Sequence, residues 1–233
     1  MRAYLYLLVF IPVTGLFALS AIIGTLFDSS GSCYAAHARL WARFGLALNR
    51  TPVELRGAEH LPDGPFILMS NHQSNFDILA LIAAIPRRIY WIAKKELFDI
   101  PIFGSSMRRG GYIPLDRSHG RKALKSMDNA AAIISQGSSV VMFPEGTRSC
   151  DGQLLPFKRG GFMLAVRAGV PVIPVTINGS GRVNPGGRIA LYSGRITLLL
   201  HPRITVPAGM KKGEAEEWLM EKVRSVITSG QEI

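Results

Sequence analysis

The stretch of residues 66–85, FILMSNHQSNFDILALIAAI, gives the clearest indication of the fold class of this chain. It opens with an uninterrupted apolar run at residues 66–69, passes through a polar turn at residues 71–75, and continues as an apolar run of helical length. A short apolar run without alternation is typical of a strand that is buried on both faces. The stretch therefore predicts a strand followed by a helix that covers it, the unit from which parallel sheets are built.

The same alternation of short apolar runs and longer helical runs continues outward from this unit, which predicts an α/β fold with a largely parallel central sheet flanked by helices. We expect strands at residues 53–56, 66–70, 89–93, 112–115, 139–143 and 172–177, followed by a hairpin of residues 188–192 and 195–200. We expect helices at residues 76–85, 97–108, 120–136, 160–168 and 214–228. In such folds functional residues lie on loops at the strand ends.

The N-terminal part has a different character. Residues 3–27 carry no charge, and as a helix they would extend about 37 Å, enough to cross a hydrocarbon core of roughly 30 Å. Residues 32–48 interleave Trp41 and other apolar side chains with arginines, which is typical of an interfacial amphipathic helix. We expect residues 1–50 to be membrane-attachment helices and residues 51–233 to form one globular domain. A cleaved signal peptide is the alternative, and a broken or half-inserted helix stays open because Pro12 interrupts the run.

The charge balance points to anionic partners. The 233 residues include 27 Lys and Arg against 16 Asp and Glu, a formal net charge of +11. Ten basic and three acidic residues fall within residues 87–125, so the charge is clustered. Cys33 and Cys150 suggest neither a disulfide framework nor a zinc site, and we expect a reducing intracellular compartment. No phosphate-binding P-loop motif is present, which disfavours nucleotide-driven chemistry.

The polar turn Asn71-His72-Gln73-Ser74-Asn75-Phe76-Asp77 is the first candidate site. His72 and Asp77 are five residues apart, so a continuous helix would point them about 140° apart, and pairing needs a turn. In such a turn a carboxylate would hold one imidazole nitrogen protonated while the other accepts a proton from a hydroxyl. Ser74 and Asp77 also have the spacing of a helix capping box, and the two interpretations are compatible.

The second candidate site is Phe143-Pro144-Glu145-Gly146-Thr147-Arg148, directly after a strongly β-forming run. It places a carboxylate, a glycine and a guanidinium at the end of an expected strand. Gly146 lets the backbone approach a ligand, Arg148 suits phosphate oxygens, and Glu145 can accept hydrogen bonds from a polyol. The alternative is an ordinary β-turn with a surface arginine.

Four ordered blocks resemble the phospholipid and glycerol acyltransferase family, and within it the 1-acylglycerol-3-phosphate acyltransferases. They are Asn-His-x4-Asp at 71–77, Gly-Tyr-Ile-Pro-Leu-Asp-Arg at 111–117, Phe-Pro-Glu-Gly-Thr-Arg at 143–148 and Val-Pro-Val-Ile-Pro-Val at 170–175. The blocks span about half of the chain, and their joint order makes the resemblance more specific than any single block. Pro114 departs from the pattern, because many members carry a plain apolar residue there, and it indicates a strand end or edge.

The resemblance implies a role for residues in each block. His72 would be the catalytic base, oriented by Asp77. The substrate-binding residues implied by the resemblance are Lys94, Arg117, Glu145, Gly146, Thr147, Arg148 and Lys158. Among these the cations would hold the acceptor phosphate and Glu145 and Gly146 the glycerol moiety, while Pro174 would shape the wall of the site.

The implied reaction moves a fatty acyl group from acyl-CoA or acyl carrier protein to the sn-2 hydroxyl of 1-acylglycerol 3-phosphate, giving phosphatidic acid. A thioester is already activated, so we expect no covalent enzyme nucleophile and no cofactor, and residues 179–181 are interpreted as a loop. No metal is expected either, since His72, Asp77, His119 and Glu145 form no recognised ligand spacing.

The expected partners are a membrane lipid acceptor, the acyl donor and an anionic membrane surface, with no nucleic acid. The uneven charges that flank residues 3–27 predict that the catalytic domain lies on the cytoplasmic side of the membrane. Glycerol 3-phosphate, a lyso-ornithine lipid or another lysophospholipid remain alternative acceptors. A thioester hydrolase and a non-catalytic membrane-surface protein are the alternatives from other classes.

Overall fold

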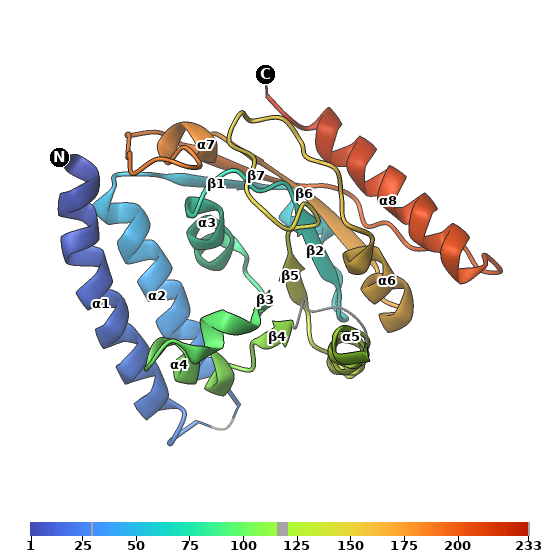
Figure 1. Ribbon diagram of the computed structural model, residues 1–233, viewed down its shortest axis with the longest axis horizontal. Helices are drawn as coiled ribbons and strands as arrows, with labels where there is room; N and C mark the ends of the chain where they lie inside the picture. Colours follow the sequence, from blue (N-terminus) through green and yellow to red (C-terminus); the bar gives the residue numbers. More distant parts are fainter. Residues whose placement is uncertain (29, 116–120, 233) are drawn as a thin grey trace.

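A seven-stranded sheet runs through the centre of the molecule in the order β1-β7-β6-β2-β5-β3-β4 (Figure 1). The computed structural model describes residues 1–28, 30–115 and 121–232. The strands are β1 (Val53–Arg56), β2 (Ile67–Ser70), β3 (Tyr90–Lys94), β4 (Ile113–Leu115), β5 (Val140–Met142), β6 (Val172–Asn178) and β7 (Ile196–Leu200). All strand pairs are parallel except β6 with β7, so the predicted α/β fold with a largely parallel sheet is confirmed.

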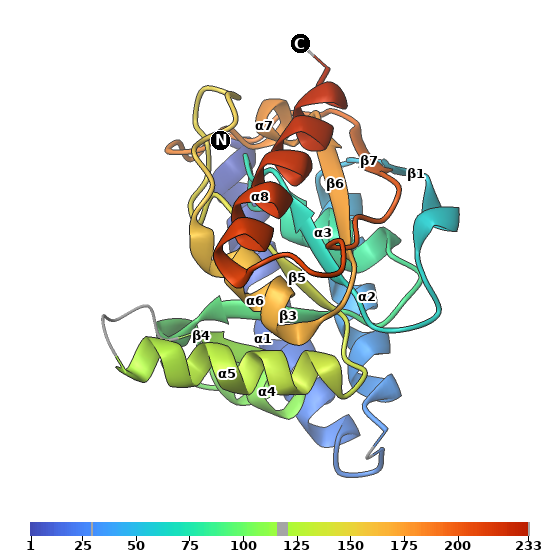
Figure 2. The ribbon, with the colours of Figure 1, turned by 90° about the vertical axis from the view of Figure 1, so that its right-hand side faces the viewer.

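Helices cover both faces of this sheet. They are α1 (Arg2–Gly24), α2 (Ser32–Leu48), α3 (Phe76–Ala84), α4 (Phe103–Arg109), α5 (Arg121–Ser135), α6 (Arg159–Ala168), α7 (Ser180–Val183) and α8 (Lys212–Ser229), with short 3-10 turns at Ala58–His60 and Lys95–Asp99. In Figure 1 the helices α1 to α4 lie on one side of the strands, and α5, α6 and α8 lie on the other. Figure 2 shows α8 and α6 stacked along their face of the sheet.

Strand β2 explains why both faces are covered. Its residues are all buried, and they alternate between the two hydrophobic cores, with Leu68 on the α1–α3 side and Ile67 and Met69 on the α5, α6 and α8 side. Successive side chains of a strand point to opposite faces, so an all-apolar strand needs a helix layer on each. The central position of β2, paired with β5 and β6, follows from this.

The N-terminal helices pack onto the same body. Helix α1 is the one helix in the described ranges that is long and apolar enough to cross a membrane by length and composition. It lies against α2 and α4, and its Tyr6 reaches Phe76 of α3 with ring centroids 5.7 Å apart. Trp41 of α2 donates its indole N–H to the hydroxyl of Thr14, at 2.9 Å. The predicted N-terminal apolar helix is therefore present and docked.

The predicted hairpin of residues 188–192 and 195–200 is wrong. Only its second half is a strand, and β7 pairs with β6 on one edge and with β1 on the other. Because both edges are occupied, no position remains beside β7 for a hairpin partner. The first half instead folds back on α7, where Tyr192 N donates to Val183 O at 2.9 Å and Asn184 Nδ2 donates to Ala190 O at 3.0 Å.

Two local predictions also need correction. The helix expected at 97–108 is two pieces, a 3-10 turn at Lys95–Asp99 and α4, because Pro101 interrupts the hydrogen-bond ladder and Ile102 takes a positive φ of 62°. Residues 179–181 were expected to be a loop, but Ser180 begins the short helix α7, which Gly179 precedes in the left-handed conformation with φ 85°. Leu97 and Phe103, on either side of the break at Pro101, line the cavity described below.

Candidate active site

The carboxyl end of β2 continues into the turn that carries His72. Asn71, the first residue of the turn, is buried and makes two hydrogen bonds to one residue of the neighbouring strand β6. Its Nδ2 donates to Ile177 O at 2.9 Å, and its Oδ1 accepts from Ile177 N at 2.7 Å. This paired contact fixes where the turn leaves the sheet, one residue before the imidazole.

His72 and Asp77 are paired as the spacing predicted for a turn. The His72 Nδ1 lies 2.8 Å from Asp77 Oδ2, and the Asp77 side chain is fully buried while that of His72 is 13% exposed. A carboxylate can only accept, so Nδ1 carries the proton and the other ring nitrogen, Nε2, is left as an acceptor. No hydrogen bond joins Nε2 to another residue in the part of the chain that the structure describes.

The same carboxylate also begins helix α3. Asp77 Oδ2 accepts from the backbone N–H groups of Gln73 and Ser74, each at 2.8 Å, and Ser74 Oγ accepts from Phe76 N at 3.1 Å. Of these donors, Phe76 N belongs to the first turn of α3, while Gln73 and Ser74 precede the helix. Ser74 and Asp77 therefore make bonds of the capping type, and the same carboxylate pairs with His72.

The loop after β5 holds the backbone of His72 from both sides. Glu145 Oε1 accepts from His72 N at 2.7 Å, and Ser149 N donates to His72 O at 2.8 Å. The second oxygen of Glu145 accepts from Leu155 N at 2.8 Å. Burial raises the pKa of the Glu145 carboxyl above its usual range, although these two N–H donors act in the opposite direction.

Aromatic rings connect the imidazole to the interior. The His72 ring stacks on Phe143 with centroids 3.8 Å apart and planes 8° apart. Phe143 in turn contacts Trp91 of β3, at 5.7 Å between centroids. The stacking removes one face of the imidazole from solvent and leaves its edge, with Nε2, as the reactive part.

Exposed cations lie around this turn. Arg148 donates from Nη1 to Asn75 Oδ1 at 3.1 Å, which places its guanidinium beside the start of α3. Gly146 has a positive φ of 71°, and a Cβ there would meet the Lys158 side chain at 3.0 Å, so Lys158 crosses directly over it. Thr147 is exposed between them. A negatively charged group would find two cations here.

The other residues implied by the resemblance are placed less closely. Lys94 ends β3, which β5 separates from β2, and its Nζ lies 3.7 Å from Glu96. Pro174 is buried inside β6, opposite Met69 of β2. Arg117 and His119 lie outside the described residues.

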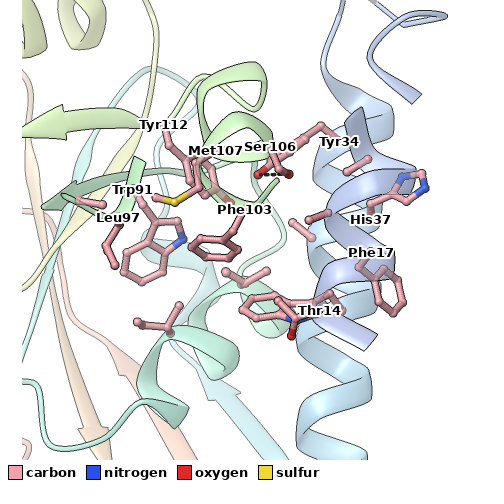
Figure 3. Close-up of a pocket in the computed structure, with 17 residues that line it drawn as sticks. Thr14, Phe17, Tyr34, His37, Trp91, Leu97, Phe103, Ser106, Met107 and Tyr112 are labelled. Carbon is pink, nitrogen blue, oxygen red and sulfur yellow. Dashed lines mark hydrogen bonds between the residues drawn. The ribbon is translucent and has the colours of Figure 1, made fainter. Parts of the chain in front are cut away.

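A cavity of about 140 Å³ lies on the α1–α4 side of the sheet. Figure 3 shows its wall, with Trp91 and Phe103 on one side and side chains of α1 and α2 on the other. The wall is almost entirely hydrocarbon, and burial raises the pKa of its Tyr112 phenol well above the usual value. Trp91 lines the cavity and contacts Phe143, which stacks on His72, so the rings of Trp91 and Phe143 connect the cavity to the imidazole.

Sequence reasoning missed three of these contributions. The sequence places Phe143 at the end of an expected strand and the start of the second block, Trp91 inside the expected strand at 89–93, and Asn71 in the first motif, and it assigns none of them a contact with His72 or the cavity. Their partners are far away in the sequence, so no spacing could reveal the contacts. A signal was nevertheless present for Phe143, an aromatic side chain at the strand end directly before the Pro-Glu-Gly turn.

The arrangement suits removal of a proton from a hydroxyl group. Nε2 of a neutral imidazole accepts the proton, the Asp77 carboxylate stabilises the imidazolium that forms, and nearby cations can hold an anionic substrate. Hydrophobic space two rings away suits a long apolar substituent.

Comparison with known proteins identifies the family. The family model described as Acyltransferase matches residues 52–178, which include the turn at His72 and the loop at Glu145. The chain is 37% identical over 171 residues to the chloroplastic 1-acyl-sn-glycerol-3-phosphate acyltransferase BAT2 of Brassica napus, covering 72% of this chain and 49% of that protein. It is 31% identical over 204 residues to a 1-acyl-sn-glycerol-3-phosphate acyltransferase of Pseudomonas aeruginosa, covering 83% and 79%.

Among solved structures, the 1-acyl-sn-glycerophosphate acyltransferase PlsC of Thermotoga maritima matches with a TM-score of 0.82 and 26% identity, covering 98% of this chain and 97% of that one. The chain spans about half the length of the plant relatives that it matches. The match covers the sheet, the His72 turn and the N-terminal helices alike. The chain belongs to the Acyltransferase family.

Proposed function

We propose that this protein transfers an acyl group from an acyl thioester to the sn-2 hydroxyl of 1-acylglycerol 3-phosphate, giving phosphatidic acid. The observation that carries the proposal is the 2.8 Å contact of His72 Nδ1 with the buried Asp77, which leaves Nε2 as a base in the turn whose Asn75 bonds to exposed Arg148. The names of the relatives in Brassica napus and Pseudomonas aeruginosa support the same acceptor.

His72 acts as a general base in this proposal. Its Nε2 takes the proton of the acceptor hydroxyl as the oxygen attacks the thioester carbonyl carbon. The tetrahedral intermediate then expels the thiol, which leaves with the proton from the imidazolium as the carbon–sulfur bond breaks. General-base help of this kind is worth roughly 10²–10⁴ in rate, and the rest comes from positioning and electrostatics.

The cations hold the acceptor in place. Arg148 and Lys158 bind the acceptor phosphate, with Arg117 of the second block and Lys94 at the end of β3 as further contributors. Gly146, which Lys158 crosses, and the exposed Thr147 precede Arg148 in the same loop, and their backbone and hydroxyl groups contact the glycerol moiety in this proposal. Charge-assisted hydrogen bonds from guanidinium to phosphate are the strong ones in such sites.

The apolar cavity binds an acyl chain of the substrates. Its hydrocarbon wall offers no partner to a phosphate, whereas burial of each methylene group there contributes about 0.8 kcal/mol. The ring contact from Trp91 to Phe143 places the cavity on the interior side of the stacked imidazole. A carbonyl carbon near His72 would therefore extend its chain away from the cations.

Helix α1 attaches the protein to the membrane in this proposal. Its outward face is apolar and exposed, and the side chains that form it are Leu5, Leu8, Leu16, Leu19 and Ile23, with exposed Leu26 and Phe27 in the turn directly after the helix. Arg2 at one end bonds to Asn49 O and Thr14 near the middle bonds to Trp41 of α2, while α1 packs on the domain through Tyr6 against Phe76 and through α4. A helix docked in this way presents one face to lipid, so we propose that it enters one leaflet beside the site.

The proposal also includes the division of the chain into two parts and the side of the membrane on which the catalytic part lies. Residues 1–50 serve as the attachment region and residues 51–233 as the catalytic domain, on the cytoplasmic side, where acyl-CoA and acyl carrier protein are available. Basic residues between 87 and 125 add attraction to anionic lipid, of about 1 kcal/mol for each residue near the surface.

The test is an acceptor panel with the purified protein in vesicles. Acyl-CoA and acyl carrier protein thioesters are each supplied with 1-acylglycerol 3-phosphate, glycerol 3-phosphate, a lyso-ornithine lipid and lysophosphatidylcholine, and products are identified by mass spectrometry. We expect phosphatidic acid to form faster than the products of the lyso-ornithine lipid and lysophosphatidylcholine by at least about tenfold, the difference that 1.4 kcal/mol of phosphate recognition produces, and faster than the product of glycerol 3-phosphate. Faster acylation of glycerol 3-phosphate or of an acceptor without a phosphomonoester, or release of free fatty acid as the main product, would overturn the proposal.

A further inference from the structure

Glu145 is the one carboxylate of the Phe143–Arg148 block, and it faces inward. Its side chain is 2% exposed, whereas Thr147 and Arg148 of the same block are exposed. Both of its oxygens accept backbone N–H groups, from His72 at 2.7 Å and from Leu155 at 2.8 Å. Both oxygens thus have main-chain partners inside the fold, and little of the carboxylate is open to an acceptor hydroxyl at the surface.

The bond to His72 has a matching one on the other side of the same residue. Ser149, four residues after Glu145, donates its N–H to His72 O at 2.8 Å. The backbone of His72 is therefore gripped at its nitrogen and at its oxygen by one loop. That loop follows β5, which lies beside β2 in the sheet, so the two turns are neighbours because their strands are.

The side chain of His72 is set by different groups. Asp77 fixes its Nδ1, and Phe143 stacks on one ring face. Backbone and side chain are thus held independently, with Glu145 on the first and Asp77 on the second. A buried carboxylate needs hydrogen-bond partners, and the two main-chain donors supply them to Glu145 without a ligand.

We propose that Glu145 is a positioning residue for His72, and that it holds the catalytic turn in register with the loop after β5 without contacting the glycerol acceptor. This inference rests on the proposed function, because the alignment of the His72 turn with the loop after β5 affects catalysis only if His72 is the base. It differs from the role that the family resemblance implies for this residue, which is contact with the glycerol moiety. Displacing a base by about 1 Å can cost on the order of 10²-fold in rate.

The experiment compares Glu145→Gln with Glu216→Gln as a matched control. Glu216 is also a buried acid, 7% exposed, but it pairs with Arg159 away from His72. A glutamine at 145 keeps the size of the side chain, and its amide nitrogen would face an N–H donor where a carboxylate oxygen accepted. We expect Glu145→Gln to lower kcat by about 10–100-fold with the KM for 1-acylglycerol 3-phosphate changed less than about threefold.

The contrary results are equally specific. A KM for the acceptor that rises about tenfold or more with kcat near the wild-type value would make Glu145 an acceptor-binding residue. Wild-type kcat and KM together would remove any role in the site. A loss of kcat in the Glu216 variant of the same size would reduce the effect to general destabilisation and would also overturn the proposal.

A second measurement uses the wild-type protein alone and no substrate. Amide proton resonances of His72 and Leu155, followed by nuclear magnetic resonance against pH, should shift together as Glu145 is protonated. Burial raises the pKa of this carboxyl, so both resonances should shift at a pH above about 4.3, the usual pKa of glutamate. His72 and Asp77 are the other charged groups near Glu145, and each resonance is followed in Asp77→Asn to separate their titrations.

If the amide resonances of His72 and Leu155 shift at different pH values, the two N–H groups do not share the Glu145 carboxylate. That result would overturn the proposal even if Glu145→Gln does not fold. Because this measurement needs no acyl transfer, it stands if the acceptor panel shows another activity. Failure of the proposed function and failure of the positioning role are therefore distinguishable.

Discussion

The His72 turn and the apolar cavity lie two rings apart and are built in opposite ways. In the turn, Asp77 Oδ2 accepts three hydrogen bonds and Glu145 accepts two, so the geometry is set by directional contacts. The cavity wall is made of side chains from α1, α2, α3, β3 and α4, and its Tyr34 and Ser106 hydroxyls are joined by a contact of 3.5 Å. Its shape is set by packing.

The difference indicates a division of labour. Directional bonds hold a base to a fraction of an ångström, which is what proton transfer requires. Hydrophobic packing accepts chains of similar shape and measures them only by the area that they bury. We therefore expect changes in the turn to act on kcat and changes in the cavity to act on acyl-chain preference.

The largest effect is expected for His72→Ala. The variant removes the base and keeps the Asp77 bonds to Gln73 N and Ser74 N, so helix α3 keeps its start. We expect kcat to fall by about 10²–10⁴-fold with little change in Tm. The matched control is His60→Ala, a histidine that bonds to Leu200 O outside the site. A kcat for His72→Ala within threefold of the control would break the assignment of chemistry to the turn.

A smaller effect is expected for Arg148→Ala. Loss of a charge-assisted hydrogen bond to phosphate costs about 1.5–3 kcal/mol, so the KM for 1-acylglycerol 3-phosphate should rise roughly 10–100-fold while the KM for the donor changes little. Arg203→Ala removes an exposed arginine outside the four blocks and serves as control. If the KM for the donor rises instead, the cations beside the turn bind the thioester carrier.

The cavity is tested by Ala18→Leu. Ala18 is buried and lines the cavity, so three added carbon atoms reduce its space. Losing room for two methylene groups costs about 1.6 kcal/mol, and kcat/KM for the longest chains should fall about tenfold relative to short ones. Gly15→Leu is the matched control on the outward face, since a Cβ at Gly15 meets nothing within 4 Å. The prediction fails when series of donor and acceptor chain lengths both show unchanged preference.

The smallest effect is expected for His201→Gln, which lies outside the His72 turn and the cavity and changes the stability of the fold. Burial, and then the charge of His60, lower the pKa of His201, whose Nε2 contacts Thr176 Oγ1 at 2.8 Å. The unfolded chain therefore binds the proton more readily, and the stabilisation present above pH 6.5 is lost as pH falls through the folded pKa. In His201→Gln the drop in Tm between pH 8 and pH 5.5 should be smaller than in wild type. An equal drop in both proteins would mean that other groups carry this pH dependence.

Local pattern carried most of the prediction of the fold. Residues 66–85 show a buried strand, a polar turn and an apolar helix, and all three are present. The hairpin at 188–200 failed because β7 takes both partners from strands that are distant in the chain, which no local pattern records. Pro101 was a visible signal for the break before α4, but the apolar run around it outweighed that signal in the sequence interpretation.

The site was predictable only where its parts are close in sequence. The pairing of His72 with Asp77 follows from their spacing together with a turn. The grip of Glu145 and Ser149 on the backbone of His72 depends on β5 lying beside β2, and the cavity depends on how α1 and α2 dock. These contacts are tertiary, and they change the expected part of Glu145 from substrate binding to positioning.

The division of labour is tested most directly by a double-mutant cycle of Asp77→Asn and Ala18→Leu. In each of the four proteins kcat/KM is measured with a long-chain and a short-chain substrate. If the turn and the cavity act separately, Asp77→Asn lowers both values equally, Ala18→Leu lowers the long-chain value alone, and the two effects add within about 0.5 kcal/mol. A coupling energy above about 1 kcal/mol for the long chain would contradict the account and make the ring stack from His72 to Trp91 part of the catalytic machinery.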